Sequence, residues 1–500
     1  MRWYAPGHDP LPCPPPRDGT WNDALTPAIL AVPGTEGALA RLREPGALVV
    51  TTGQQPGLFT GPAYTVHKAL AAAALAAELS QRWDRPVLPI FWLAGDDHDF
   101  AEASTASWLD ASGAVAEWHL DPRDPAAPQR SMAHEPLPVD VLSGLRTLEQ
   151  SLPGGPDRDH TMTWLRQHYV PGCTLQQAFA GAIAELLAPF GVLCFDPTHE
   201  AFKRAQVPVL LRALTQAAEL DSALAALPDP GTRIVTGEGA TLVFYEDAGG
   251  RDRLLLDGND FLGRRSGARF TLASAAANLE EHPGRWSANV LLRPVVEAAL
   301  LPTVAYVAGP GEYRYLTRQA ASLYPLLGVT PQLPVPRWSG TLIEPWADRL
   351  LQRLGITEAE LLADDGTLGR DILRRDLPPA VPRALANLRG AIAESAASLT
   401  EAGHAIDAVL ERAVASRQRR LDQVSDDLER LLERHLRKRS DIAYSQYLRL
   451  RGALLPRGVP QERALSAPSF LARHGQAWLQ GVRDATTEWA RRLEPAPRAD

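Results

Sequence analysis

The chain has 500 residues, of which 45% are hydrophobic and 22% are charged, and its formal net charge is −8. This composition is typical of a folded globular protein, and the length predicts two or three domains. The negative net charge argues against a dedicated nucleic-acid-binding protein, which needs a basic face. The N-terminus lacks the apolar stretch of a signal peptide, and no apolar run is long enough for a transmembrane helix. We therefore expect a cytoplasmic protein with neither a membrane nor a nucleic-acid partner.

Cysteine and lysine are both rare in this sequence. Cys13, Cys173 and Cys194 are widely spaced and form no CxxC pair, which predicts neither a disulfide framework nor a cysteine zinc site. Cys194 lies in an apolar run and is expected to be a buried strand thiol. Only three lysines accompany 48 arginines. Because lysine is a compact charge that arginine does not replace at a tight phosphate or carboxylate contact, Lys68 is a candidate for such a contact.

The first hundred residues predict a βαβ unit. Residues 1–45 form proline-rich loops and a short helix, and residues 47–52 form a buried strand. A glycine-rich loop leads into a helix rich in alanine and leucine at residues 63–83. A second apolar strand follows at residues 86–94 and ends in the sequence GDDHDF. Continuous apolar strands of this kind are typical of a parallel sheet that is covered on both faces.

Further strands extend this pattern toward the C-terminus. Residues 119–160 are rich in proline and charge and are expected to be a surface connection, while residues 190–197 form another strand. Residues 232–272 alternate short strands with glycine turns, which predicts an antiparallel insertion. Residues 302–327 form a strand, a Gly-Pro loop and a helix. The predicted fold class is therefore α/β, with a Rossmann-like, doubly wound core of parallel strands.

The C-terminal part predicts a helical domain. Residues 386–440 contain no proline, and apolar residues recur there at three- and four-residue steps among charged ones. This pattern predicts two antiparallel helices or a coiled coil, whose apolar stripe must pack within the chain or dimerise. The expected domains are a core at 1–384 with inserted connecting segments at about 110–170 and 205–290, coiled-coil helices at 385–445, and a segment at 446–500 that packs back on the core.

The first candidate site is the glycine-rich loop between the first strand and its helix. Backbone amides and the helix dipole at such a position attract anions, and glycines let a ligand approach closely. The loop matches neither common nucleotide motif, and a purely structural βα turn is the alternative. The candidate substrate- or nucleotide-binding residues here are Gly53, Gln54, Gln55, Thr60, Gly61, Tyr64, His67 and Lys68.

The second candidate site follows the second strand directly. Asp97, His98 and Asp99 lie beyond a strand's carboxyl end, where ligands bind in open α/β sheets. These ionisable groups could orient an amine or act as a general base, and they are the candidate catalytic residues. Metal binding and a helix cap with solvated charges are the alternatives, and we predict no metal because one compact cluster gives no ligand set.

The third candidate site lies at the end of a later strand. Gly309, Gly311 and Glu312 precede a helix, and Glu312 is either a ligand-binding carboxylate or a cap that compensates the helix dipole. Just upstream, Asn289 and Arg293 are further candidates. Arg293 could bind a carboxylate with two hydrogen bonds, or it could form a structural salt bridge to Glu297, four residues later.

Five motifs carry a resemblance to a known family. In chain order they are TGQQPGLFTGPAYTVHK, FWLAGDDHDF, NVLLRP, LPTVAYVAGPGE and YLRLRGALLPRGVPQER, which together span roughly residues 50 to 465. With these motifs the chain resembles the bacillithiol cysteine-adding enzyme family. The resemblance implies a Rossmann-like core similar to that of class I aminoacyl-tRNA synthetases and nucleotidylyltransferases, with connecting-peptide insertions and a coiled coil that supports a homodimer. It also implies that His67 and Lys68 occupy the helix start where synthetases bind phosphates.

The expected function follows from this resemblance. The chain would be a ligase that joins cysteine to glucosaminyl malate by an amide bond, in the last step of bacillithiol biosynthesis. ATP or another nucleotide with Mg²⁺ is expected as the activating cosubstrate by analogy alone. The alternatives are a nucleotidyl- or aminoacyl-transferring enzyme with another acceptor, and a non-catalytic assembly protein whose coiled coil is its function.

Overall fold

The computed structural model describes residues 1–6, 10–124, 127–228, 234, 237–375, 378, 380–404, 406–439 and 441–494. They form two compact units. One unit contains Ala5–Thr341 and the residues from Glu462 onward, and the other contains Met1–Tyr4 and Leu342–Gln461. The core therefore ends earlier than residue 384, where we expected its boundary. The reason is that the helices before the proline-free stretch pack against a helix that follows it.

The first unit is built on a sheet of five parallel strands in the order β13-β12-β2-β3-β6. These strands are β2 (Leu48–Gln54), β3 (Val87–Leu93), β6 (Leu193–Phe195), β12 (Thr303–Ala308) and β13 (Leu333–Pro336). The chain adds β3 and β6 on one side of β2 and then returns to place β12 and β13 on the other. This order confirms the Rossmann-like prediction and sets the switch point between β2 and β12.

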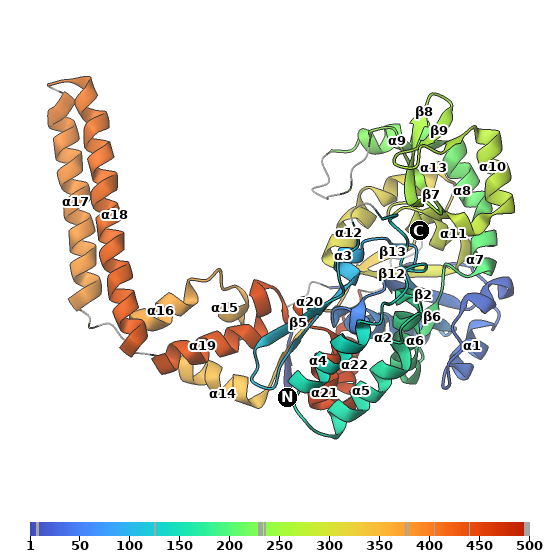
Figure 1. Cartoon of the computed structure of the whole chain (residues 1–500), viewed down its shortest axis with the longest axis horizontal. Coiled ribbons are helices and arrows are strands. Elements are labelled where there is room, and N and C mark those ends of the chain that lie inside the picture. Colours follow the sequence, from blue (N-terminus) through green and yellow to red (C-terminus); the bar gives the residue numbers. More distant parts are fainter. Residues whose placement is uncertain are drawn as a thin grey trace. The chain divides into compact units, whose positions relative to one another are not determined.

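Helices cover both faces of this sheet. α2 (Tyr64–Trp83) packs on β2, β3 and β12 and is itself covered by α22 (Gln476–Ala490), while α6 (Leu175–Leu187) packs on β6 (Figure 1). Val49, Ile90 and Trp92 join a hydrophobic core with α8 (Val207–Thr215) and α11 (Arg293–Leu300). The C-terminal residues thus pack on the core through α22. Further helices of this unit are α1 (Glu36–Leu42), α7 (Glu200–Ala205), α9 (Ala217–Ala225), α12 (Pro310–Thr317), α13 (Leu323–Leu326) and α21 (Ala467–His474).

The segment between β3 and β6 forms a small layer of its own. After α3 (Phe100–Ala103), β4 (Thr105–Leu109) and β5 (Val115–His119) pair antiparallel and are followed by α4 (Val141–Ser151) and α5 (Pro156–His168). Val141, Leu145 and Leu148 of α4 are buried with Trp108 in a second hydrophobic cluster. The expected surface connection at 119–160 is therefore wrong for α4, because these apolar residues recur at helical spacing despite their proline-rich flanks. Residues 125–126 lie outside the described part.

A second five-stranded sheet lies between β6 and β12 in the sequence, and its strand order is β10-β9-β8-β7-β11. All of its pairs are antiparallel, which confirms the predicted insertion. The strands are β7 (Ala240–Asp247), β8 (Gly250–Asp257), β9 (Asp260–Gly263), β10 (Arg269–Phe270) and β11 (Trp286–Ala288), and α10 (Leu272–Glu281) lies between β10 and β11 in the chain. The predicted segment began at residue 232, and its residues 232–233 and 235–236 lie outside the described part.

The second unit is helical. α17 (Ala380–His404) and α18 (Ala408–Arg439) lie side by side as an antiparallel pair, which confirms the predicted helix pair (Figure 1). The other helices are α14 (Pro345–Leu354), α15 (Glu358–Leu362), α16 (Leu368–Arg375) and α19 (Asp441–Leu454), and β1 (Arg2–Tyr4) pairs with β14 (Thr341–Ile343). α14, α15 and α16 pack on α19, so residues 446–461 belong to this unit and not to the core. No helix in the described residues is long and apolar enough to cross a bilayer.

All three cysteines are free thiols. Cys194 lies in β6 and is buried, as predicted, and burial raises the pKa of its thiol to about 12. Such a thiol stays protonated at neutral pH and is a poor nucleophile.

Candidate active site

A cavity lies at the switch point of the parallel sheet, beyond the carboxyl ends of β2 and β12. Its volume is about 290 Å³, and nine of the predicted site residues line it: Gly53, Gln54, Gln55, Tyr64, Asp97, Arg293, Gly309, Gly311 and Glu312. These residues come from four segments that are far apart in the sequence: residues 53–64, Asp97, Arg293 and residues 309–312. The structure therefore brings the three candidate sites together.

Two neighbouring cavities share walls with this one. A larger, open cavity of about 1430 Å³ is lined by His98 and Asp99 and shares Gln55 and Asp97 with the first. A smaller cavity of about 230 Å³ is lined by Asn289 and His98 and shares Asp97 with both. Asp97 therefore borders all three spaces. Four predicted residues, namely Thr60, Gly61, His67 and Lys68, line none of these three cavities.

Lys68 lies directly behind the wall of the first cavity. Its side chain is 1% exposed, and its ammonium donates to the Gly53 carbonyl and, over 2.6 Å, to Oε2 of Glu312. Glu312 Oε2 also accepts from the Gly309 amide over 2.8 Å. Burial opposes ionisation of Glu312, but Lys68 and the Gly309 amide outweigh it and hold the pKa of that carboxyl below its ordinary value. Lys68 is thus a buried counter-ion and a link between β2 and the loop after β12.

Glu312 and Arg293 also form hydrogen bonds and ion pairs with other residues of the protein. Glu312 occupies the capping position of α12, as the capping alternative predicted, and its Oε1 accepts from the Tyr306 hydroxyl over 2.8 Å. Arg293 donates to Glu297 over 2.9 Å and to the Tyr306 oxygen over 3.2 Å. The salt bridge to Glu297 is therefore formed, and Arg293 reaches the cavity as part of a buried network of fixed charges.

His67 points away from the cavity. Its Nδ1 lies 2.8 Å from Oε2 of Glu462, and its ring packs against Trp338 and Trp478. Burial lowers the pKa of His67, so the imidazole is neutral in the ordinary pH range. His67 therefore fixes α2 against the C-terminal segment and does not reach a ligand in the cavity.

The loop that contains Thr60 and Gly61 is folded into the protein interior. The Tyr169 hydroxyl accepts from the Thr60 amide over 2.6 Å and donates to the Gly57 carbonyl over 2.8 Å. Phe59 and Thr60 both have positive φ angles and are fully buried. At the start of α2, the Ala63 amide donates to the Leu465 carbonyl. The Thr60 and Ala63 amides therefore already donate hydrogen bonds within the protein. This part of the loop is a structural βα turn, which was the alternative to the predicted anion site.

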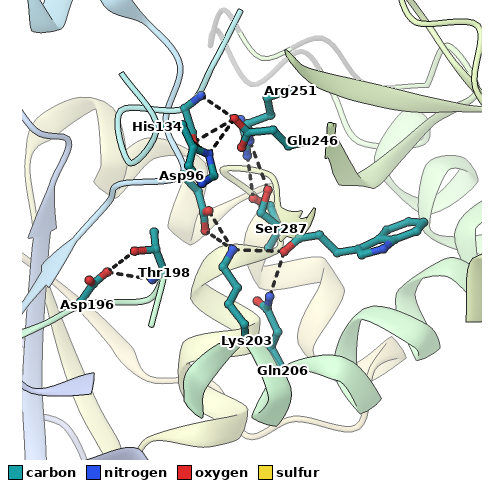
Figure 2. Close-up of polar contacts among 12 residues, drawn as sticks. Asp96, His134, Asp196, Thr198, Lys203, Gln206, Glu246, Arg251 and Ser287 are labelled. Carbon is teal, nitrogen blue, oxygen red and sulfur yellow. Dashed lines mark hydrogen bonds and ion pairs between the residues drawn. The ribbon is translucent and has the colours of Figure 1, made fainter. Parts of the chain in front are cut away.

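The acidic segment after β3 divides its residues among different roles. Oδ1 of Asp97 accepts from the His98 and Asp99 amides, while Oδ2 makes no hydrogen bond within the described residues. Asp99 is the N-cap of α3 and accepts from the Glu102 amide over 3.2 Å. Asp96 is paired with the buried Lys203, 2.8 Å away (Figure 2). Of these three acidic residues only Asp97 lines the switch-point cavity, and its Oδ2 has no hydrogen-bond partner among the described residues.

His98 is held as a neutral hydrogen-bond donor. Arg251 donates to its Nδ1 over 2.9 Å, which leaves the ring proton on Nε2. Burial first, and then the Arg251 charge, lowers the pKa of His98 to about 4. With Nδ1 occupied and Nε2 protonated, His98 has no lone pair for a substrate proton. In this arrangement Asp97 is the better candidate base.

Several residues around the cavity were not singled out from the sequence. Arg337 and Arg463 line it, and both lie over the ring of Tyr64. Arg337 is paired with Glu462, whereas Arg463 forms no hydrogen bond or salt bridge within the described residues. Glu462 and Arg463 end the YLRLRGALLPRGVPQER motif, which was the available signal for both. Arg251 lies in the antiparallel insertion, where no motif marked it.

The acidic segment was also a possible metal site from its sequence. No three His, Cys, Asp or Glu side chains gather there in a way that could hold a metal ion. Asp96 and Asp99 are used in an ion pair and a helix cap, as described above. The acidic segment therefore presents one carboxylate to the cavity and not a ligand set.

Comparison with known families covers almost the whole chain. Residues 28–337 match the family described as bacillithiol biosynthesis BshC, N-terminal Rossmann-like domain. Residues 340–490 match its C-terminal coiled-coil domain. The division between the two matches falls close to the Thr341/Leu342 boundary of the structural units, but the second match continues beyond Gln461 into residues that belong to the first unit.

Similar full-length proteins carry one common name. A protein of Solibacter usitatus is 32% identical over 88% of this chain and 82% of its own length. Proteins of Salinibacter ruber and Symbiobacterium thermophilum are 30% and 31% identical and cover 90% and 87% of this chain, and 83% and 81% of their own lengths. All three are named "Putative cysteine ligase BshC". With both domains matched in order, this chain belongs to the bacillithiol biosynthesis BshC family.

Proposed function

We propose that this protein is a ligase that joins the carboxyl group of cysteine to the amine of glucosaminyl malate, in the last step of bacillithiol biosynthesis. The relatives named as cysteine ligases support the reaction class. The observation that carries the proposal is the switch-point cavity, whose wall contains the Asp97 carboxylate and the Arg463 guanidinium. Among the described residues, neither Asp97 Oδ2 nor the Arg463 guanidinium has a hydrogen-bond partner. The reaction joins an amine to a carboxylate. The Asp97 carboxylate can bind the amine, and the Arg463 guanidinium can bind the carboxylate.

The proposed chemistry needs a proton acceptor beside the attacking amine. An amine is protonated at neutral pH and attacks only after it loses a proton, so a carboxylate within hydrogen-bond reach lowers the barrier. Asp97 Oδ2 takes this proton in our proposal, and the two backbone amides on Oδ1 hold the carboxylate in place. The nitrogen then forms the bond to the cysteine carbonyl carbon as the activating group leaves. His98 Nε2–H and Gln55 are donors on the adjoining wall.

Activation of the cysteine carboxylate is required because amide formation from a free carboxylate is uphill in water. ATP with Mg²⁺ remains our proposal by analogy with class I synthetases. The residues present do not fit a phosphate site at the start of α2. Lys68 is paired with Glu312, His67 with Glu462, and the loop amides with Tyr169 and Leu465. A phosphoryl donor would have to bind elsewhere on the cavity walls, where Arg463 forms no salt bridge with any described residue.

The helical pair also supports a homodimer. Although α17 and α18 pack on each other, a row of apolar side chains on them remains exposed. On α18 the row consists of Leu410, Leu421, Val424, Leu428 and Leu431. The last four of these residues follow one another at three- and four-residue steps. Such a stripe is unfavourable in water and is the usual signature of a helix that packs on a second copy.

A product assay tests the proposed function. The purified protein is incubated with cysteine, glucosaminyl malate, ATP and Mg²⁺, and thiol products are identified by mass spectrometry. We expect a product whose mass is the sum of the two substrates minus one water. Parallel reactions that replace ATP with other phosphoryl donors identify the activating group from the coproduct. Absence of the product under every nucleotide and metal condition would contradict the proposal.

A further inference from the structure

The antiparallel insertion presents two arginines to the smallest of the three cavities. Side chains two residues apart on a strand point to the same face, so Arg251 and Arg253 of β8 share one face of the sheet. Both line the cavity of about 230 Å³, together with His98 and Asn289. Phe244 of β7 lies opposite Arg253, and its ring centroid is 3.9 Å from the Arg251 guanidinium carbon and 5.6 Å from that of Arg253. The ring holds both guanidinium groups on the cavity wall.

Within the described residues, no carboxylate forms a salt bridge with these arginines, and Asp96, Asp97 and Glu246 act on Arg251 only through space. Arg251 is buried, and its guanidinium donates to Ser287 Oγ over 3.1 Å (Figure 2). Its other acceptors among the described residues are also neutral, namely His98 Nδ1 over 2.9 Å and the Ala288 carbonyl over 3.3 Å. The Arg253 side chain makes neither a hydrogen bond nor a salt bridge within the described residues, and its guanidinium only lies over the Phe244 ring. A buried charge normally requires a counter-ion, because its transfer out of water is costly.

A third arginine increases the positive charge at this wall. Arg264 lines the adjoining open cavity together with Arg253, and it too forms no salt bridge among the described residues. After burial, the Arg264 charge is the largest influence that lowers the pKa of Arg253, and Glu238 opposes it through space without a salt bridge. Like charges that face a cavity without a bound carboxylate are the arrangement expected of a site that receives an anion.

We propose that Arg251, Arg253 and Arg264 form the subsite that binds the carboxylates of the malate group of the acceptor. This inference rests on the proposed function and deepens it. The planar guanidinium matches a carboxylate with two parallel hydrogen bonds, and two or three of them suit a dicarboxylate. Asp97 lies on the same cavity and carries the opposite charge. One ligand that bears an amine at one end and two carboxylates at the other therefore satisfies both sides.

The test compares two acceptors in Arg253→Gln, which removes one guanidinium and leaves the Arg251–His98 contact intact. We expect the KM for glucosaminyl malate to rise by roughly 10-fold or more, because a hydrogen bond to a charged group is lost. The KM for methyl glucosaminide, which has the amine but no carboxylate, should not change. Arg264→Gln, a second variant that alters the open cavity beside Arg253, should give a smaller change in the same direction. Arg269→Gln is the matched control, since Arg269 is exposed and paired with Asp257 on the same sheet.

Calorimetry separates this inference from the ligase proposal. Binding of glucosaminyl malate is measured directly, so the result does not depend on turnover. If the wild type forms no thiol product but Arg253→Gln still weakens glucosaminyl malate binding, the result supports the malate subsite and contradicts the ligase proposal. Equal losses for both acceptors, no loss for either, or a rise in the KM for ATP in place of the KM for glucosaminyl malate would each overturn the malate subsite.

Discussion

Lys68 of α2, which is buried, and Glu312 of α12, which is partly exposed to the cavity, form an ion pair across the switch point of the parallel sheet, with 2.6 Å between Nζ and Oε2. Through the Gly53 carbonyl and the Gly309 amide, the same two side chains also hold the ends of β2 and β12. The two strands on either side of the cavity are therefore joined by one polar link. The distance between their loops, and with it the shape of the cavity floor, depends on this link.

Breaking this pair should destabilise the first unit. In Lys68→Met, Glu312 loses its counter-ion while it remains largely out of water, and we expect a loss of about 3–5 kcal/mol in the free energy of unfolding. Arg166→Met removes an exposed pair with Glu149 and should cost only about 0–1 kcal/mol. Urea titrations of both variants measure the difference. Equal, small losses in the two variants would show that the buried pair contributes no more than a surface one.

The turn before α2 should behave as structure and not as a phosphate site. Tyr169→Phe removes the hydroxyl that accepts from Thr60 and donates to Gly57, which leaves a buried amide and a buried carbonyl unsatisfied. We expect a loss of about 1–3 kcal/mol of stability. The KM for ATP should stay within twofold of the wild type, since the loop holds no phosphate in our account. A large rise in the KM for ATP, in a variant that is as stable as the wild type, would show that the loop does bind the nucleotide.

His98 should make stability depend on pH. Its pKa is about 4 in the folded protein, below the ordinary value of 6.5, so the unfolded chain binds more protons between these values. The contribution of His98 to the free energy of unfolding is therefore fully present above pH 6.5, and it is lost as the pH falls toward 4. His98→Gln keeps an acceptor for Arg251 but does not titrate. The stability of the wild type minus that of the variant should fall from pH 7 to pH 4.5 in denaturant titrations, whereas a flat difference would place the His98 pKa at its ordinary value.

The helix pair α17 and α18 should form the dimer interface. Leu421→Glu with Leu428→Glu places two charges on the exposed apolar row of α18, and a charge buried at an interface without a counter-ion is costly. We expect light scattering after gel filtration to show a dimer for the wild type and a monomer for this variant. Arg419→Glu, about half a helical turn from Leu421, is the control and should remain a dimer. A wild-type monomer would contradict the proposal outright.

The architecture was predictable from the sequence because its signals are local. The apolar runs of β2 and β3 fit only strands that are covered on both faces, and glycines after strands mark the turns at the sheet's edge. Since the carboxyl ends of parallel strands share one edge, the loops with Gly53, Asp97 and Glu312 had to lie near one another. The proline-free stretch likewise predicted α17 and α18.

The roles of individual side chains were less predictable because they depend on distant residues. His67 and Lys68 are adjacent, yet one helical residue turns the side chain by about 100°, so one faces Glu462 and the other Glu312. Tyr169 occupies the glycine-rich loop from more than a hundred positions away and carries no motif. Arg251 reaches His98 from an insertion whose pattern specified only strands. In each case tertiary packing, not local sequence, decides the contact.

The most direct test of the active site compares Asp97→Asn with Asp99→Asn in the product assay. Asparagine is as good an N-cap as aspartate, so Asp99→Asn should keep both fold and activity. Asp97→Asn keeps its amide contacts through the side-chain oxygen but loses the proton acceptor, and we expect kcat to fall by about 10²–10⁴-fold at unchanged stability. Full activity in Asp97→Asn, or an equal loss in Asp99→Asn, would contradict the assignment of Asp97 as the base in the switch-point cavity.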